Sequence, residues 1–414
     1  MSAPLLLPDA LRETLAFQPQ GARAGNLTVG RGVLDGRAVR VALVESRFAS
    51  GAIGALEAGR LVALFKVAAL EHAPLVVYLD SAGAKVSEGL KALGAFRALF
   101  HAALEYRAGA APMAAVLGKN CYGGSSMLAH LATHRIFSPA TQLAMSGPAI
   151  LAAQAGMSAV DEMFRAMAEA AMAPAARAQS SAANTVWEPG ADLAPWLRAA
   201  LGAAPANAHA NHEELARRFE RALGEGSMEP VRRRDLERIY ADGYEAREAQ
   251  GLLEGEGRRG GGAEAFLGLV GRKPVGAERA WRFADKAWKL GPGAPARLEV
   301  FLDCATHAAR LEDEKVVLSE YIVDMSLALD HLARHGTRVG LTIVGQAGGG
   351  VYVALAASAH RVASLHGADI QVLPGAAVAA ILGESAGGAA AFDDYRAAGV
   401  ADEELKLGFI PGTA

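Results

Sequence analysis

The stretch Leu75-Val76-Val77-Tyr78-Leu79-Asp80 decides the fold, because the chain repeats it as Leu298-Glu299-Val300-Phe301-Leu302-Asp303. Each copy is followed by a glycine pair, a His-Arg pair and a proline. The second glycine precedes the histidine by ten positions in both copies (124 to 134, 350 to 360), and the histidine precedes the proline by fourteen (134 to 148, 360 to 374). Self-similarity on this scale indicates two related domains.

The residues around each copy predict alternating strands and helices. Short apolar runs at 75–79 and 113–117 are typical of strands buried on both faces, and 54–70, 88–106 and 125–132 read as helices. A hairpin around Asp35-Gly36 is expected within 26–45. The second copy gives strands at 298–302, 338–344 and 360–364, an extended piece at 368–373, and helices at 312–335 and 351–358. This alternation predicts an α/β fold with parallel pairing.

A chain of 414 residues favours at least two domains. We expect an N-terminal domain at 1–172, a connecting region at 173–262 and a C-terminal domain at 263–414. The connecting region is rich in alanine, then charged and helical at 211–250. It is expected to end in a flexible linker, Glu-Gly-Glu-Gly-Arg-Arg-Gly-Gly-Gly, at 254–262.

Composition excludes several classes of function. A net charge of −3 points to neither nucleic acid nor an acidic membrane as a partner. Two cysteines exclude a disulfide framework, and no histidine spacing supports a metal site. The N-terminus lacks the pattern of a signal peptide, and glycines or prolines interrupt the uncharged stretches 136–160 and 339–359. A cytoplasmic protein is therefore expected.

The glycine pairs are the candidate chemical groups. A Gly-Gly pair between a buried strand and a helix allows a tight turn and exposes N–H groups at the helix N-terminus, where partial positive charge collects. Such donors can stabilise an oxyanion or an enolate. One pair alone could serve only close packing, but two pairs in matching contexts favour a functional role.

Three segments resemble the carboxyltransferase branch of the crotonase-like superfamily. They are Asp-Ser-Ala-Gly-Ala-Lys-Val-Ser-Glu-Gly at 80–89, Lys-Asn-Cys-Tyr-Gly-Gly-Ser-Ser at 119–126 and Ser-Gly-Pro at 146–148. Within that branch the chain is most similar to the biotin-independent malonate decarboxylases, whose β and γ subunits would be fused here. Ala82 and Lys85 depart from the family's glycine and arginine. The resemblance implies two crotonase-like α/β domains of repeated ββα units.

The same resemblance implies decarboxylation of a malonyl thioester held on the phosphopantetheine arm of an acyl carrier protein, or on coenzyme A. We expect no cofactor on this chain. We expect the chain to form a homodimer or a larger complex. The implied oxyanion-hole positions are Gly83, Ala84, Gly123, Gly124, Gly349 and Gly350. The implied substrate-binding positions are Ser81, Lys85, Lys119, Tyr122, Ser125, Cys304, Ala305 and Thr306. The proton donor to the enolate stays unassigned, with Tyr122, Ser125 and Lys119 as candidates.

Two other functions stay open at this point. A biotin-dependent carboxyltransferase would need a separate biotin carrier, because no Met-Lys-Met segment occurs. A scaffold without catalytic activity that binds an acyl carrier is motivated by the altered Asp-Ser-Ala-Gly element. The stretch Gly-Glu-Ser-Ala-Gly-Gly at 383–388 resembles an esterase nucleophile elbow, but no histidine follows His366 to complete a triad in the order of that fold.

Overall fold

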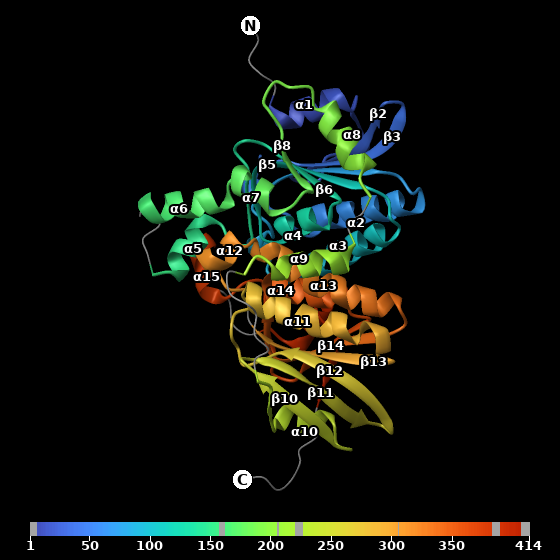
Figure 1. Cartoon of the computed structure of the whole chain (residues 1–414), viewed down its shortest axis with the longest axis vertical. Helices are drawn as coiled ribbons and strands as arrows, with labels where there is room; N and C mark the ends of the chain where they lie inside the picture. The colour runs from blue at the N-terminus through green and yellow to red at the C-terminus, as the bar shows by residue number, and fades with distance from the viewer. Residues whose placement is uncertain are drawn as a thin grey trace. The chain divides into compact units, whose positions relative to one another are not determined.

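The computed structural model describes residues 6–156, 162–204, 207–219, 227–304, 306–382 and 390–406. The chain divides into two compact units, each with its own sheet (Figure 1). The first unit comprises residues 1–88, 98–207 and 309–323, and the second comprises 89–97, 208–308 and 324–414. The segment expected as a connecting region is therefore shared, with 173–207 in the first unit and 208–262 in the second.

The sheet of the first unit has the strand order β1-β2-β3-β4-β5-β6-β8, with β7 paired to β5. Neighbours from β3 to β8 are parallel, whereas β1, β2 and β3 pair antiparallel. The strands are β1 Gln18–Pro19, β2 Leu27–Leu34, β3 Arg37–Val44, β4 Leu75–Ser81, β5 Met113–Tyr122, β6 His134–Phe137, β7 Gln142–Ala144 and β8 Asn184–Val186.

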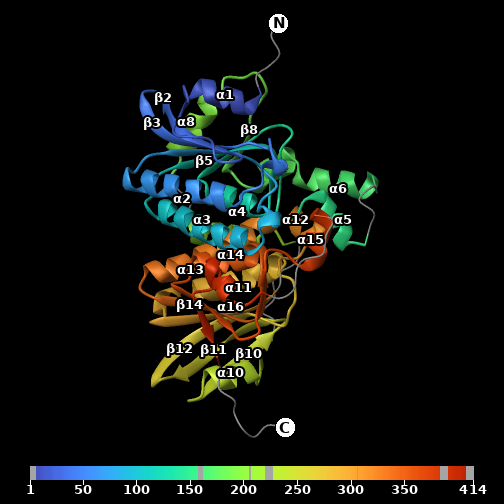
Figure 2. The same ribbon diagram turned by 180° about the vertical axis from the view of Figure 1, so that it is seen from behind.

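Helices cover both faces of this sheet (Figure 1). On one face α1 and α8 pack through Leu11 and Leu197 onto a core that includes Trp187 and strand residues such as Val41 and Val76. On the other face lie α2 and α4, and Figure 2 shows the same arrangement from behind. The helices wholly within this unit are α1 Leu7–Thr14, α2 Ala55–Leu70, α4 Gly124–Leu131, α5 Pro148–Gln154, α6 Glu162–Met172, α7 Pro174–Ser180, α8 Ala194–Gly202 and α12 Leu311–Lys315, with 3-10 turns η1 Ala49–Gly51 and η2 Val86–Glu88.

The sheet of the second unit has the order β17-β15-β14-β13-β12-β11-β10-β9, with β16 paired to β14. Its parallel part runs from β12 to β17, and β9 to β12 pair antiparallel. The strands are β9 Glu229–Pro230, β10 Tyr244–Ala249, β11 Leu252–Arg259, β12 Gly262–Leu269, β13 Arg297–Cys304, β14 Arg338–Gly348, β15 Arg361–Leu365, β16 Asp369–Gln371 and β17 Glu403–Leu405.

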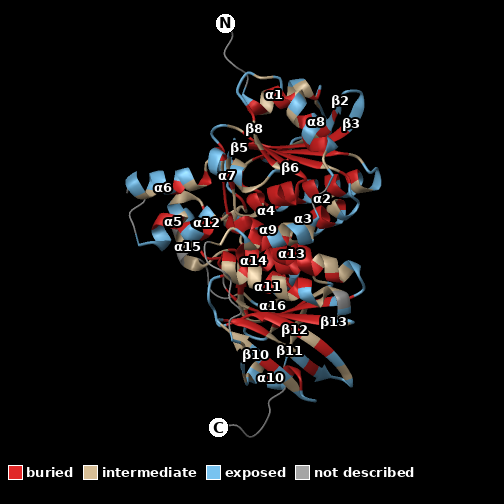
Figure 3. Cartoon of the chain, viewed as in Figure 1, coloured by how far each residue is buried: buried red, intermediate tan, exposed pale blue. Residues whose placement is uncertain are grey.

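One face of the second sheet carries α10, whose Leu236, Ile239 and Tyr240 pack on strand residues such as Phe266 and Phe301. The opposite face carries α11 and α14, and the central strands of both sheets are buried (Figure 3). Two helices, α3 and α13, contribute residues to both units. The bounds are α3 Leu90–Ala108, α9 Ala208–Ala216, α10 Arg234–Ile239, α11 Ala277–Leu290, η3 Gly291–Gly293, α13 Leu318–Arg334, α14 Gly349–Ala357, α15 Gly375–Leu382 and α16 Phe392–Ala397.

The α/β fold class, the hairpin about Asp35-Gly36 and the parallel pairing are confirmed. The flexible linker at 254–262 was a wrong prediction, because these residues form β11, a turn and the start of β12. Two of the glycines there, Gly255 and Gly257, serve packing. A Cβ on Gly255 would lie 2.0 Å from the Glu245 carbonyl, and one on Gly257 would lie 2.5 Å from the Tyr240 ring.

Two helical expectations also need correction. Residues 211–250 hold the end of α9, then β9, α10 and β10, because Tyr244 to Ala249 pair with β11. The helix expected at 312–335 is two helices, since Val317 adopts a φ of 70° between α12 and α13. No helix among the described residues is long and apolar enough to span a bilayer.

Candidate functional site

The first glycine turn is built where β4 and β5 end side by side. The Asp80 carboxylate accepts the Asn120 amide at 3.0 Å, and the strand register shifts between Leu79 and Ser81. Gly118 permits this approach, since a Cβ there would lie 2.5 Å from Asp80 Cβ. Gly123 then turns the chain with a φ of 56°, and α4 begins at the next residue. The turn therefore depends on a carboxylate and on two glycines.

Several amides of the first turn are already used within the protein. The Gly83 amide donates to Ser81 Oγ at 3.1 Å, and the Gly123 amide donates to the Ala144 carbonyl at 3.1 Å. Ala84 forms a parallel bridge with Ile53, in which the Gly83 carbonyl and the Lys85 amide take part and the Ala84 amide does not. Gly124 is the first residue of α4, so its N–H has no acceptor within the helix. Ala84 and Gly124 are thus the amides best placed to hold a ligand oxygen.

The predicted side chains divide into a buried set and an exposed set. Ser81 and Ser125 are fully buried, and the Ser125 hydroxyl donates to Ser81 Oγ at 2.8 Å. Tyr122 donates its hydroxyl to Gln142 and packs beside a buried cluster, while burial raises its pKa. Lys85 pairs with Glu88 at 2.9 Å, and Lys119 on β5 is exposed. Ser125 and Tyr122 therefore have hydrogen-bonding roles within the protein, and the proton donor is still unassigned.

The sequence pattern did not predict a role for Glu314, which the fold brings behind the first turn. Its side chain is fully buried and accepts the amides of Met145 at 3.2 Å and Ser146 at 2.8 Å. Burial raises the pKa of Glu314 to about 7, against the opposing effects of Arg177 and the two amides. Arg177 also donates to the Glu314 carbonyl at 2.8 Å. Glu314 therefore fixes the start of the Ser-Gly-Pro segment. This segment follows closely after Ala144, whose carbonyl accepts the Gly123 amide.

The second glycine turn repeats the backbone of the first. Asp303 accepts the Gln346 amide at 2.8 Å, and a Cβ on Gly345 would lie 2.1 Å from the Asp303 carboxylate. Gly349 has the same φ of 56° as Gly123, and its amide donates to the Val372 carbonyl at 3.2 Å. Gly350 follows within the first turn of α14. The role of its amide as an oxyanion donor stays a prediction.

The side chains at the second turn differ from those at the first. Cys304 is fully buried and donates through Sγ to the Thr306 carbonyl at 3.0 Å. His307 forms the bridge with Val275 that Ala84 forms with Ile53. The sequence reading also missed His307, although the repeat aligns it with Ala84 (303 to 307, 80 to 84). Ala305 lies outside the described residues, as does the 383–388 motif.

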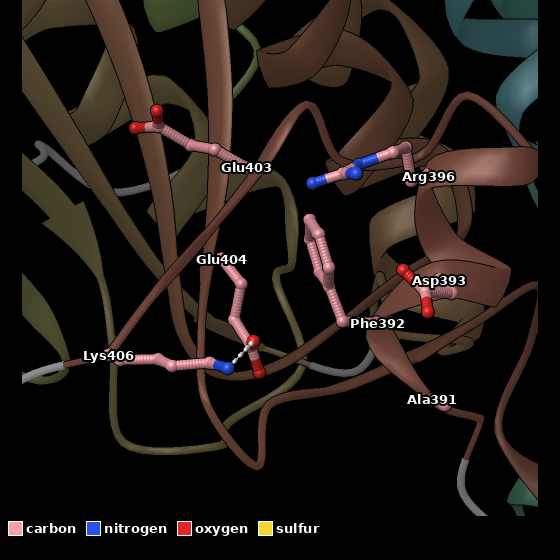
Figure 4. A pocket seen from close by; sticks show the side chains of 7 residues that line it. All are labelled: Ala391, Phe392, Asp393, Arg396, Glu403, Glu404 and Lys406. Atoms are coloured by element: carbon pink, nitrogen blue, oxygen red, sulfur yellow. Dashed lines mark ion pairs between the residues drawn. The ribbon is translucent and has the colours of Figure 1, made fainter.

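Described residues of the second unit line at least two cavities. One of about 270 Å³ lies at the ends of β14 and β16 and is lined by Gln346, Ala347, Asp369, Gln371, Pro374 and Gly375. The other, of about 510 Å³, is lined by residues of α16 and β17. Figure 4 shows Arg396 over the Phe392 ring, with its guanidinium carbon 4.9 Å from the ring centroid, and Glu404 paired with Lys406 at 3.4 Å. Of these two, the cavity at the ends of β14 and β16 adjoins a glycine turn.

The chemical groups that the two turns present are main-chain N–H donors, which can bind an oxyanion. They are not reactive nucleophiles. Burial raises the pKa of both Cys121 and Cys304, which keeps each thiol protonated. Among the described residues no group of three or more histidine, cysteine or acidic side chains is placed to hold a metal. The turns are therefore suited to stabilising negative charge on an acyl oxygen.

Two curated relatives are similar to part of this chain. The 12S subunit of methylmalonyl-CoA carboxyltransferase from Propionibacterium freudenreichii is 26% identical over 133 residues, 32% of this chain and 25% of the relative. The β subunit of acetyl-coenzyme A carboxylase carboxyl transferase from Synechococcus is 27% identical over 151 residues, 36% of this chain and 48% of the relative. The chain thus spans between a quarter and a half of the length of these curated relatives.

Solved structures with similar folds are more distant in sequence. A transcarboxylase 12S structure is 18% identical with a TM-score of 0.40, covering 97% of this chain and 86% of that one. A Pseudomonas malonate decarboxylase hetero-tetramer is 17% identical with a TM-score of 0.46, covering 53% of this chain and 91% of that one. Residues 12–175, which include the first glycine turn, match the family model of the carboxyl transferase domain.

Proposed function

We propose that the protein decarboxylates a malonyl thioester to an acetyl thioester through an enolate. The observation that carries the proposal is the first glycine turn within the carboxyl transferase match, where the Gly124 amide begins α4. A second turn with the same Gly349 φ of 56° supports a repeated oxyanion-binding function. The sequence relatives are named for carboxyl transfer on coenzyme A thioesters, which is chemistry at the same carbon.

In the proposed reaction the bond between the α-carbon and the carboxylate breaks. Its electron pair moves toward the thioester carbonyl to form the enolate, and carbon dioxide leaves. A proton then adds to the α-carbon. Main-chain amides lower the barrier because they stabilise charge that appears on the oxygen as the bond breaks, and one such donor is worth roughly 3 kcal/mol. The chain itself supplies no cofactor in this scheme.

The thioester is proposed to arrive on the phosphopantetheine arm of an acyl carrier protein or on coenzyme A, in the cytoplasm. A homodimer or a larger complex belongs to the same proposal. The altered residues Ala82 and Lys85, which follow Ser81 at the first turn, are expected to affect the choice of acyl group, because they flank the Gly83 and Ala84 positions.

The test is release of carbon dioxide from a malonyl carrier protein without ATP, biotin or metal. Gly123→Ala adds a methyl group that would lie 3.8 Å from Gly83 Cα, and it strains the turn because a φ of 56° with a ψ of −130° is a backbone conformation that suits glycine. We expect kcat to fall about 100-fold with the fold retained. Gly156→Ala is the control, since its φ of 67° is similar and no heavy atom lies within 4 Å of the added Cβ. Full activity in Gly123→Ala would refute the mechanism.

A second candidate is carboxyl transfer from a biotin carrier, which the names of the sequence relatives favour. The same turns would then stabilise the enolate that attacks carboxybiotin. Incubation of the acyl thioester with and without carboxybiotin separates the two. Turnover only in its presence selects transfer, whereas binding without turnover under either condition selects a scaffold that does not catalyse the reaction.

A further inference from the structure

The β3–α2 loop, residues 45–54, holds the part of the first glycine turn that carries the Ala84 amide. Ile53 in this loop donates its amide to the Gly83 carbonyl at 2.8 Å and accepts the Lys85 amide at 2.9 Å. These two hydrogen bonds lie on either side of Ala84 in the chain. The direction of the Ala84 N–H therefore depends on where the loop lies.

The same loop has an unfavourable backbone conformation. Ala49 and Ser50 have φ of 43° and 52°, and Gly51 follows with a φ of 72°. The left-handed region is costly for residues other than glycine. The Ser50 carbonyl nevertheless lies in place to accept the Ala82 amide at 2.9 Å. Such a conformation persists only where the surrounding contacts fix it.

The buried side chain of Asn26, which is 3% exposed, fixes the loop on both sides of its left-handed residues. Its Oδ1 accepts the Phe48 amide at 3.0 Å, and its Nδ2 donates to the Ala52 carbonyl at 3.0 Å. Asn26 is itself held, because its main-chain amide donates to Glu57 Oε1 at 3.2 Å. Glu57 also accepts the Gly54 amide at 3.0 Å. One carboxamide therefore spans the left-handed residues.

The second unit fastens its corresponding loop with a different side chain. Val275 forms the same two main-chain hydrogen bonds with residues 306–308. Arg279 donates to the carbonyls of Val270 at 2.6 Å and Lys273 at 2.7 Å, which lie on either side of the turn before Val275. A side chain that holds this loop thus occurs in both copies, although a carboxamide does so in one and a guanidinium in the other.

We propose that Asn26 is the positioning residue of the first glycine turn. It keeps the β3–α2 loop in its left-handed conformation, and the loop in turn directs the Ala84 amide at the ligand oxygen. Asn26 does not touch the substrate in this scheme. The inference rests on the proposed function, because the reaction gives the Ala84 amide its task.

The experiment compares Asn26→Leu, which removes both side-chain hydrogen bonds at similar volume, with the control Thr133→Val. Thr133 is also buried, and its hydroxyl donates to the Met113 carbonyl at 2.7 Å, at the end of β5 away from the turn. With malonyl carrier protein, Asn26→Leu should lower kcat roughly 10-fold and change KM less than about twofold, because a displaced donor fails mainly in the transition state. Thr133→Val should keep kcat within about twofold of the unchanged protein.

Hydrogen exchange gives a measurement that does not depend on activity. Exchange in a peptide covering residues 80–86 should become at least about fivefold faster in Asn26→Leu and stay unchanged in Thr133→Val, because the released loop no longer protects these amides. Thermal unfolding shows whether each variant folds. Should Asn26→Leu fail to fold, Asn26→Asp takes its place. It keeps an oxygen for the Phe48 amide and loses the donor to Ala52, and its kcat should fall roughly threefold.

The outcomes separate this inference from the proposed function. Faster exchange at residues 80–86 in Asn26→Leu alone, together with no decarboxylation by the unchanged protein, refutes the function and leaves the role of Asn26 in holding the turn intact. Decarboxylation at full kcat in folded Asn26→Leu overturns the inference alone, and so does unchanged exchange at residues 80–86. An equal loss of kcat in Thr133→Val also overturns it, because the effect would then follow stability.

Discussion

The two glycine turns have the same backbone and different side chains. In each, an aspartate at the end of a strand accepts an amide of the next strand, through Asp80 in one and Asp303 in the other. In each, a glycine with a φ of 56° starts a helix. Ser81 and Ala84 of the first turn are replaced by Cys304 and His307 in the second. Duplication thus preserved the main-chain donors, while the groups around them diverged.

The surroundings of the first turn differ as well. Glu314 accepts two amides at 145 and 146, and the Ala144 carbonyl just before them accepts the Gly123 amide. The first turn therefore depends on a buried carboxylate from a distant part of the sequence. At the second turn, the Val372 carbonyl accepts the Gly349 amide.

The largest effect is expected when the Glu314 carboxylate is removed from behind the first turn. Glu314→Ala leaves two buried amides without their acceptor and Arg177 without a nearby carboxylate, so the free energy of unfolding should fall by roughly 3–5 kcal/mol. Urea unfolding measures the change. Glu312→Ala, at an exposed position of the same helix, is the control and should change stability by less than about 0.5 kcal/mol. A loss below about 1 kcal/mol in Glu314→Ala would show that the first turn holds without the carboxylate.

The next effect is a pH dependence that comes from Glu314 behind the first turn. Burial raises the pKa of Glu314 to about 7 from an ordinary value of 4.5. The native state therefore favours the protonated form, so this stabilisation is present below about pH 4.5 and is lost as pH rises through 7. Between pH 5 and pH 8 the protein should lose roughly 2–3 kcal/mol relative to Glu314→Gln.

Urea titrations of both proteins at each pH measure this difference, and the other ionisable groups largely cancel. A difference that is constant, or that grows with pH in favour of glutamate, would contradict the raised pKa.

The smallest effect comes from exchanging one residue between the turns. Ser81→Cys weakens the hydrogen bonds from the Ser125 hydroxyl and the Gly83 amide and should destabilise the protein by roughly 1–2 kcal/mol. Cys304→Ser keeps a donor for the Thr306 carbonyl and should change stability by less than about 1 kcal/mol. Thermal unfolding of the two variants compares them. Equal losses would mean that the polar groups of the first turn add nothing to its stability.

Local patterns predicted much of the fold. The apolar runs at 75–79 and 298–302 became the buried strands β4 and β13, and the glycine pairs became the starts of α4 and α14. These features depend on neighbouring residues, because strand burial, turn geometry and helix starts are properties of short segments. The glycines at 254–262 show the limit of such reasoning. The role of Gly255 and Gly257 as close-contact positions in a hairpin depends on Glu245 and Tyr240, which no local pattern reveals.

The candidate site was only partly predictable for the same reason. The amides at Gly124 and Gly350 were expected from the glycine pairs, whereas the internal hydrogen bonds of the Gly83, Gly123 and Gly349 amides depend on acceptors that the fold supplies. His307 could have been found by aligning the two copies residue by residue. Glu314 gave no such signal, since an acidic residue in a charged stretch is usually exposed.

By itself, the sequence determined that this protein contains a duplicated α/β unit with a glycine turn in each copy, because spacing and hydrophobic pattern are written along the chain. Only the tertiary structure decided what surrounds each turn. It buried Glu314 against residues 145 and 146, and it placed Thr306 and His307 over Gly349. Such contacts join residues far apart in sequence, and their geometry follows from how the elements pack.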